Sequence, residues 1–231
     1  MAPAFNYPPW TIVCQDGGVT RAQTWGGRTA DERRTDRRER LMAAATEIWA
    51  DGGWASVTMR GVCAKAGLID RYFYESFADR DELLVAVWDR ARDRVTSSML
   101  QSVAAQAGAP PLDALRSAVR GVLDGFVQEP SRAQILFGDH SGSANLEHRR
   151  HRLLIDVADV MVEIGMQYLK SDVDRREFRQ SVLMGVGGFL ELVAAWRAGV
   201  IEGSADDIVE QVSHFGAILG KYYLPDEDIS S

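Results

Sequence analysis

Apolar residues recur every three to four positions along most of the chain, which is the period of an α-helix with one buried face. The first stretch of this kind has apolar residues at Leu41, Ala44, Ala45, Ile48 and Trp49. Asp36 and Glu39 match a helix-capping pattern and predict the start of this helix, while Gly52 and Gly53 predict its end. The pattern therefore predicts one long amphipathic helix.

Two shorter helices and a fourth, longer one follow at once. Thr58 is a favourable N-cap for the second helix, and Gly67 stops it. The third, over about residues 71–76, is rich in aromatic residues, and Phe73 and Phe77 fall four apart on one face, so we predict that both are core. The fourth helix starts at Asp79. Two short helices joined by a tight glycine-containing turn, with a longer helix before them, predict a helix-turn-helix.

The remaining chain keeps the helical period without any β-period, so the predicted fold class is all-α. One apolar stripe runs from Phe178 to Val200, and Ser204 predicts the N-cap of a last helix with apolar positions from Ile208 to Tyr222. Residues 1–32 include several prolines and glycines and predict a flexible arm. We expect a DNA-binding domain over residues 33–95 and a second helical domain over residues 96–231.

The charge of the chain also differs between its N-terminal and C-terminal parts. The net charge is −7, but residues 1–80 hold 11 Lys+Arg against 10 Asp+Glu, whereas residues 81–231 hold 15 against 23. The run "RRTDRRER", Arg33 to Arg40, concentrates positive charge in the first part. An anionic partner is therefore expected to bind the first part, although such a run is also typical of a solvated helix start.

Composition narrows the class of protein further. Apolar residues make up 46% of the chain and charged residues 26%, which are ordinary values for a globular protein. Cys14 and Cys63 form no disulfide framework, and Cys63 falls in an apolar helical pattern that predicts a buried, reduced thiol. We see no run of about 20 apolar residues and no secretion signal, so we expect a cytoplasmic protein that does not enter a membrane.

Signatures of enzymes are missing from the sequence. It contains no GxSxG, P-loop, dinucleotide-binding glycine motif or HExxH, so we expect neither catalysis nor a cofactor. His148 and His151 lie three apart on a predicted helix, with Asp139 and His140 upstream, which leaves a transition-metal site as an alternative. Because spacing places no third ligand, a solvated helix face is the simpler interpretation.

The segment "GGWASVTMRGVCAKAGLIDRYFYESFADRDELL" resembles the DNA-binding core of the tetracycline-repressor (TetR) family of bacterial transcription regulators. The resemblance lies in the Thr58-capped second helix, "AKAGL" at the turn, "YFYESF" in the third helix and "ADRDELL" opening the fourth. It implies an N-terminal three-helix helix-turn-helix domain plus a larger C-terminal helical domain for ligand binding and dimerisation. It also implies double-stranded operator DNA, a second copy of the chain and a small-molecule effector as partners.

The same resemblance assigns the DNA-binding residues. Tyr74 matches a family tyrosine whose hydroxyl reaches a phosphate, and we expect Arg71 and Tyr72 to contact base edges. Ile69 departs from the usual Ser or Thr cap of the third helix, and Asp70 is expected to replace it. The expected contacts to phosphate and base are Arg33, Arg34, Arg37, Thr58, Arg60, Lys65, Ile69, Asp70, Arg71, Tyr72, Tyr74 and Arg80.

In the second domain we expect a pocket for a largely apolar effector, lined by Phe126, Phe137, His140, Met161, Tyr168, Phe189 and Trp196. We expect a homodimer interface on the last two helices at Gly185, Leu192, Ile208, Val212, Phe215 and Leu219. The predicted function is a regulator, in the first place a repressor released by its effector. The alternatives are a helical dimer whose DNA binding has decayed and a metal-binding or enzymatic helical protein.

Overall fold

The computed structural model describes residues 29–106 and 108–225, and every regular element in these ranges is a helix. The all-α prediction is thereby confirmed. The elements are α1 (Ala30–Gly52), η1 (Trp54–Ser56), α2 (Met59–Ala66), α3 (Asp70–Tyr74), α4 (Arg80–Ala105), α5 (Pro111–Gln128), α6 (Pro130–Phe137), α7 (Ala144–Gly165), η2 (Met166–Tyr168), α8 (Arg175–Arg197) and α9 (Ala205–Tyr223).

The start of α1 differs from the prediction. Thr29, not Asp36, is the N-cap: its hydroxyl accepts from the backbone N–H of Glu32 at 3.1 Å, and its own N–H donates to the Glu32 carboxylate at 2.6 Å. This reciprocal capping box satisfies two backbone groups at once. The predicted arm is therefore too long at its end, since residues 30–32 are helical, and the rest of it, residues 1–28, lies outside the described residues.

The glycine and capping signals at the other predicted helix ends are confirmed, whereas the third helix is Asp70–Tyr74 rather than residues 71–76. Gly53 and Gly67 end α1 and α2 with φ angles of 75° and 62°, a region that favours glycine. Asp79 caps α4 by accepting from the N–H of Glu82 at 2.8 Å. Ser204 forms a capping box at the start of α9. These local signals place α2, α3 and α4 at fixed positions relative to one another.

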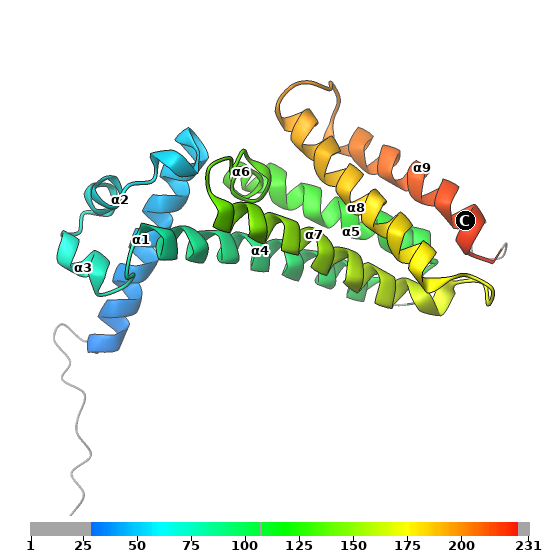
Figure 1. Ribbon diagram of the computed structural model, residues 1–231, viewed down its shortest axis with the longest axis horizontal. Helices are drawn as coiled ribbons and strands as arrows, with labels where there is room; N and C mark the ends of the chain where they lie inside the picture. The colour runs from blue at the N-terminus through cyan, green and yellow to red at the C-terminus, as the bar shows by residue number, and fades with distance from the viewer. Residues whose placement is uncertain (1–28, 107, 226–231) are drawn as a thin grey trace, which may run out of the picture.

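The helices form an elongated molecule, with α1, α2 and α3 at one end and α8 and α9 towards the other (Figure 1). Helix α4 leaves the first group and runs along the second, so the predicted boundary at residue 95 falls inside one continuous helix. In the second group α5 packs against α4 and α9, and α7 packs against α8. The two parts thus share an element rather than a linker.

The core is continuous across the junction between the two parts. A single cluster of buried side chains includes Leu41 and Trp49 of α1, Leu84 of α4 and Leu136 of α6. His140 is fully buried in this junction, with its ring 6.0 Å from that of Trp49 in an edge-to-face arrangement. The contact between Trp49 of the first part and His140 of the second therefore makes the core continuous at the junction.

The imidazole of His140 is neutral in this setting. Its Nε2 donates to the carbonyl oxygen of Ile135 at 2.9 Å, while its buried Nδ1 has no hydrogen-bond partner. Burial lowers the pKa of His140, because a charged imidazolium there would lose its hydration. The backbone oxygen of Ile135 and the nearby Glu147 raise the pKa in the opposite direction, to a smaller extent.

Helix α8 is more apolar than the sequence analysis expected. By length and composition alone it is long enough to cross a membrane, and only 22% of its most apolar window is buried inside the chain. It still contains no uninterrupted run of about 20 apolar residues, because Gln180, Ser181 and Glu191 interrupt it, but its mean hydropathy is high. One face of α8 therefore lacks a covering element within the described part of this chain.

The buried His140 predicts a pH dependence of stability. Its pKa is lowered on folding, so below about pH 6.5 the unfolded chain binds a proton that the folded chain excludes. The free energy of unfolding should therefore fall between about pH 7 and about pH 5. His140→Gln, which keeps a donor for Ile135, should make this fall shallower in urea denaturation. An identical pH dependence in both proteins would contradict the assignment.

Candidate nucleic-acid interface

The turn between α2 and α3 exposes the residues that the sequence analysis assigned to DNA. Thr58 is exposed, and its hydroxyl accepts from the N–H of Gly61 at 3.1 Å, which fixes the first turn of α2. Ile69 occupies the N-cap position of α3 without any side-chain cap and is exposed. Asp70 begins the helix and does not replace the lost cap. The first turn of α3 therefore depends on its surroundings for its conformation.

The aromatic run divides between core and surface. Phe73 and Phe77 are buried, as predicted, with ring centroids 5.8 Å apart. Tyr74 packs its ring edge-to-face on Phe73 at 5.6 Å and remains 61% exposed. Tyr72 is partly buried, because the guanidinium of Arg37 lies 4.5 Å from the centre of its ring. Tyr74 thus presents more surface to a partner than Tyr72.

Several of the predicted cations serve the fold. Arg80 donates to the carbonyl oxygens of Val57 and, at 2.7 Å, Trp54, and its guanidinium lies 5.2 Å from the centre of the Trp54 ring. Arg37 donates to the carboxylate of Glu75 at 3.2 Å and is largely buried. These two side chains fasten α4 and α1 to the helix-turn-helix.

Two further arginines, which the sequence analysis did not single out, have the same role. Arg38 donates to the carbonyl oxygen of Ser76 at 2.6 Å, and Arg40 donates to that of Ala66, the last residue of α2, at 2.6 Å. A basic side chain at a helix C-terminus satisfies a carbonyl that has no partner within the helix. The run Arg33–Arg40 is therefore largely a structural clamp, and the spacing of its arginines on one helix was the signal that could have shown this.

Two of the cations that remain at the surface are paired with carboxylates. Lys65 lies 2.8 Å from a Glu47 carboxylate oxygen, which raises the pKa of Lys65 through a hydrogen bond and the opposite charge. Arg71 lies 3.0 Å from Glu75. Arg34 and Arg60 are exposed, and Arg33 is partly exposed. A polyanion on this face would find cations that can exchange a carboxylate for a phosphate.

Cys63 lies under this face. It is free and buried, as predicted, and burial, with a smaller contribution from Asp70, raises the pKa of its thiol. A shallow depression between Arg60 and Arg71 opens above it. The thiol is therefore a small packing group here rather than a nucleophile.

The predicted effector residues do not all lie in one place. Phe126 and Phe137 pack edge-to-face at 5.3 Å, and Met161 and Phe189 join Phe137 around a small buried cluster with Val186. His140 and Tyr168 flank opposite ends of the 22-residue helix α7, about 33 Å apart along its axis. Trp196 packs against the main core and donates to the carbonyl oxygen of Gly203 at 2.8 Å. The structure therefore brings together four of the seven residues.

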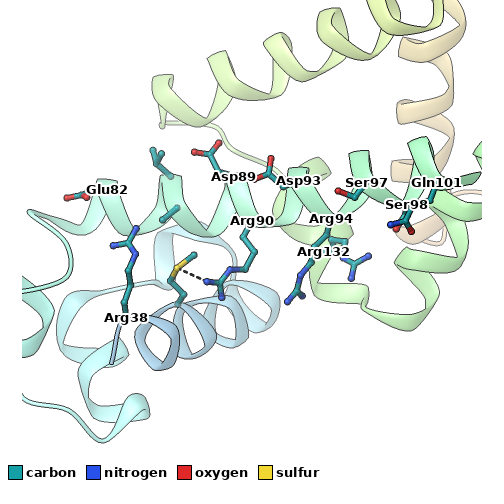
Figure 2. A pocket seen from close by; sticks show the side chains of 13 residues that line it. Arg38, Glu82, Asp89, Arg90, Asp93, Arg94, Ser97, Ser98, Gln101 and Arg132 are labelled. Carbon is teal, nitrogen blue, oxygen red and sulfur yellow. Dashed lines mark hydrogen bonds between the residues drawn. The ribbon is translucent and has the colours of Figure 1, made fainter. Parts of the chain in front are cut away.

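A groove of about 860 Å³ lies elsewhere, between α1, α4 and α6, and its lining is polar (Figure 2). Arg90 reaches from α4 towards α1, where it lies 2.6 Å from Glu39 and 3.1 Å from the sulfur of Met42. Arg94 pairs with Glu129 at 3.0 Å. Because its arginines are paired with acids, this groove differs from the apolar pocket that the sequence predicted.

The predicted dimer residues are only partly exposed. Ile208 is 4% exposed in the core of its own chain, and Leu192 and Val212 also pack against that core. Gly185, Phe215 and Leu219 lie closer to the surface. The exposed apolar stripe is displaced around the helices, and it comprises Met184, Phe215, Ile218 and Tyr222.

The described residues hold no group of three or more His, Cys, Asp or Glu side chains that could bind a metal ion. His148 and His151 are exposed on α7, and His140 is separated from them by its burial against Trp49. The metal-site alternative therefore finds no support in residues 29–106 and 108–225.

Comparison with known proteins agrees with this geometry. Residues 41–87 match the model of bacterial regulatory proteins, tetR family. The HTH-type transcriptional activator FasR of Mycolicibacterium smegmatis is 30% identical over 99 residues, which cover 43% of this chain and 44% of FasR. The chain thus aligns with less than half the length of this curated relative.

Two solved structures share the fold. SmeT, the repressor of the Stenotrophomonas maltophilia multidrug efflux pump SmeDEF, superposes with a TM-score of 0.64 at 15% identity, covering 83% of this chain and 92% of SmeT. The regulator FadR of Bacillus subtilis, in complex with stearoyl-CoA, superposes with a TM-score of 0.61 at 15% identity, covering 76% of this chain and 95% of FadR. The fold therefore extends over both parts of the molecule.

The contacts of Arg80 and Lys65 predict opposite effects of two substitutions. Arg80→Met removes the donors to Trp54 and Val57 and should lower the free energy of unfolding by about 1–3 kcal/mol. Lys65→Met breaks an exposed ion pair that contributes little to stability, and should instead weaken duplex DNA binding and reduce its salt slope by about 1. Denaturant unfolding measures the stability of each variant, and salt titrations measure its affinity for duplex DNA. A stable Arg80→Met protein with a flattened salt slope would show that Arg80 contacts phosphate.

Proposed function

Because the chain belongs to the tetR family of bacterial regulatory proteins, we propose that it is a cytoplasmic transcriptional regulator that binds operator DNA as a homodimer. In this proposal α3 enters the major groove, Arg71 and Tyr72 contact base edges, and Tyr74 reaches a phosphate. The observation that carries it is the exposure of Thr58 at the start of α2 and of Arg71 and Tyr74 on α3, the two helices joined by the tight turn at Gly67.

The acidic net charge of the chain does not oppose this function. Screening limits electrostatic repulsion to about 8–10 Å at physiological ionic strength. The excess of acids belongs to residues 81–231, whereas the proposed contacts come from α1 to α3 and the start of α4. Local charge at the interface therefore outweighs the net charge.

The apolar stripe on α8 and α9 supports dimerisation with a second copy. Met184 is 74% exposed, Ile218 52% and Tyr222 62%, which is unusual for large apolar side chains on neighbouring helices. A second copy would cover the stripe and the apolar face of α8, and it would make a membrane contact unnecessary. One recognition helix reads few base pairs, so two copies about 34–36 Å apart would read two half-sites in successive major grooves.

The function is tested by selecting duplexes from a random library with the purified protein. We expect a palindrome-like consensus, two chains per duplex, and an affinity that falls steeply with salt because arginines and lysines release counterions. The alternative of a helical dimer with decayed DNA binding predicts no consensus and no salt-dependent shift. That result would reject the proposal.

Ile218→Glu tests the dimer separately. A charge in the stripe should give a folded monomer whose affinity for the selected duplex is at least about tenfold lower, because one half-site is lost. Lys221→Glu is the matched control, since it adds a carboxylate to the same helix at an exposed position outside the stripe. If sedimentation shows that Ile218→Glu remains dimeric, the interface lies elsewhere.

We further assign repression released by an apolar effector. A dimer that covers a promoter needs no further contact to block transcription, whereas the identity with FasR favours activation as the second candidate. The B. subtilis FadR structure holds stearoyl-CoA, and Phe126, Phe137, Met161 and Phe189 gather around one buried cluster here. A molecule with a long apolar chain and one polar end fits that environment.

Long-chain acyl esters of coenzyme A are the first compounds to test, with free coenzyme A as the control that lacks the chain. The ester should raise the thermal stability of the protein and lower its affinity for the selected duplex about 5- to 150-fold, the range of an ordinary coupling free energy. Stabilisation with unchanged DNA affinity would reject the coupling. A reporter gene behind the selected sequence then separates repression from activation.

A further inference from the structure

The recognition helix α3 has five residues, which is too short for a helix to be stable by its own hydrogen bonds. It has no side-chain N-cap, so its conformation is imposed by contacts with other elements. Phe73 and Phe77 anchor its inner side in the core. On its outer side Arg38 of α1 donates to the carbonyl oxygen of Ser76, just beyond the helix, and lies 4.1 Å from the centre of the Phe77 ring.

Glu75 connects α1, which holds α3 in place, to Arg71 on the exposed side of α3. One carboxylate oxygen lies 3.2 Å from Nη2 of Arg37 on α1, and the other lies 3.0 Å from Nε of Arg71 on α3. The side chain of Glu75 is 34% exposed, that of Arg37 19% and that of Arg71 79%. A single carboxylate thus links the largely buried Arg37, whose guanidinium stacks on Tyr72, to the exposed Arg71.

The contact leaves the end of Arg71 available. Within the described residues the protein engages Arg71 through its Nε, so the two Nη groups keep the donors that a bidentate pair with guanine requires. A free arginine side chain loses rotamer entropy when it is fixed. A side chain that is already held loses less of this on binding.

From these contacts we infer that Glu75 is a positioning residue for base recognition, which holds Arg71 in the orientation that reads one base pair. The inference rests on the proposed function and adds a residue that does not itself touch DNA. A carboxylate beside the phosphate backbone is unfavourable for general affinity. Glu75 therefore lowers general affinity for DNA and raises discrimination between base pairs. Its removal should raise the general affinity and lower the discrimination.

The experiment compares Glu75→Gln with Glu47→Gln, using duplexes selected by the wild-type protein and random duplexes of the same length. Each substitution removes one carboxylate from beside a cation of the interface, Arg71 in the first case and Lys65 in the second. Both should strengthen binding to random duplex. Only Glu75→Gln should lower the preference for guanine at one position of each half-site, by about fivefold or more, which is the lower end of a bidentate contact.

Two further variants separate positioning from anchoring. Glu75→Asp keeps the charge but is one methylene too short to span both arginines, so discrimination should fall without a gain in general affinity. Arg37→Met removes the tether to α1 while keeping the Glu75–Arg71 pair, so it should weaken all base positions alike. Thermal unfolding of each variant establishes that α3 remains folded.

Unchanged guanine preference in both Glu75→Gln and Glu75→Asp would overturn the inference, and so would an equal loss in Glu47→Gln. Failure of the proposed function gives a different result, since the wild-type protein would then select no consensus from the library. Arg71→Ala provides the reference for complete loss of the contact and should relax the same base position at least as far as Glu75→Gln.

Discussion

The rest of the recognition surface depends on how α1 holds the short helix α3. Five residues cannot maintain a helix in water, so the geometry of the DNA face is set by tertiary contacts. Buried Phe73 and Phe77 supply most of the apolar burial of α3. Arg37 and Arg38 fix the orientation of α3, because each guanidinium combines a hydrogen bond with a ring contact. Cations that sequence patterns assign to DNA thus stabilise the element that meets DNA.

The same reasoning applies at the junction between the two parts. Trp49, His140 and the continuous helix α4 make one interior, so the parts cannot move independently without breaking buried contacts. Arg90 and Arg94, which pair with Glu39 and Glu129, lie on the same side of α4 (Figure 2). A change in the second part can therefore reach α1 through packed elements, which is the physical requirement for coupling between two sites.

Much of the fold follows from local patterns in the sequence. Thr58, Gly67, Asp79 and Ser204 mark helix ends because capping and positive φ angles depend on residues within one turn. The start of α1 was missed because Thr29–Glu32 and Asp36–Glu39 both match a capping pattern, and the charged residues between them form no apolar face that would decide. The positions of Phe73 and Phe77 were predictable from helical spacing alone.

The candidate site was less predictable, because its partners are distant in sequence. Arg80 and Arg40 donate to backbone carbonyl oxygens, and a carbonyl acceptor has no signature in the amino-acid sequence. The exposed apolar stripe differs from the predicted dimer residues for a related reason. The period of α9 shows that it has an apolar side, but only the packing of α5 shows that Ile208 faces inward and Ile218 outward. The roles proposed for these residues in binding remain predictions.

The length of α4 has a mechanical consequence. Its 26 residues extend over about 39 Å, with one end next to α3 and the other packed on α5 in the second part. A rigid lever of this length that tilts by about 5° displaces its far end by about 3 Å. In the proposed dimer two such levers would add their displacements. A small rearrangement of side chains at the proposed pocket around Phe126 or Phe137 would then become a mismatch of several ångströms between the two recognition helices and the grooves of DNA.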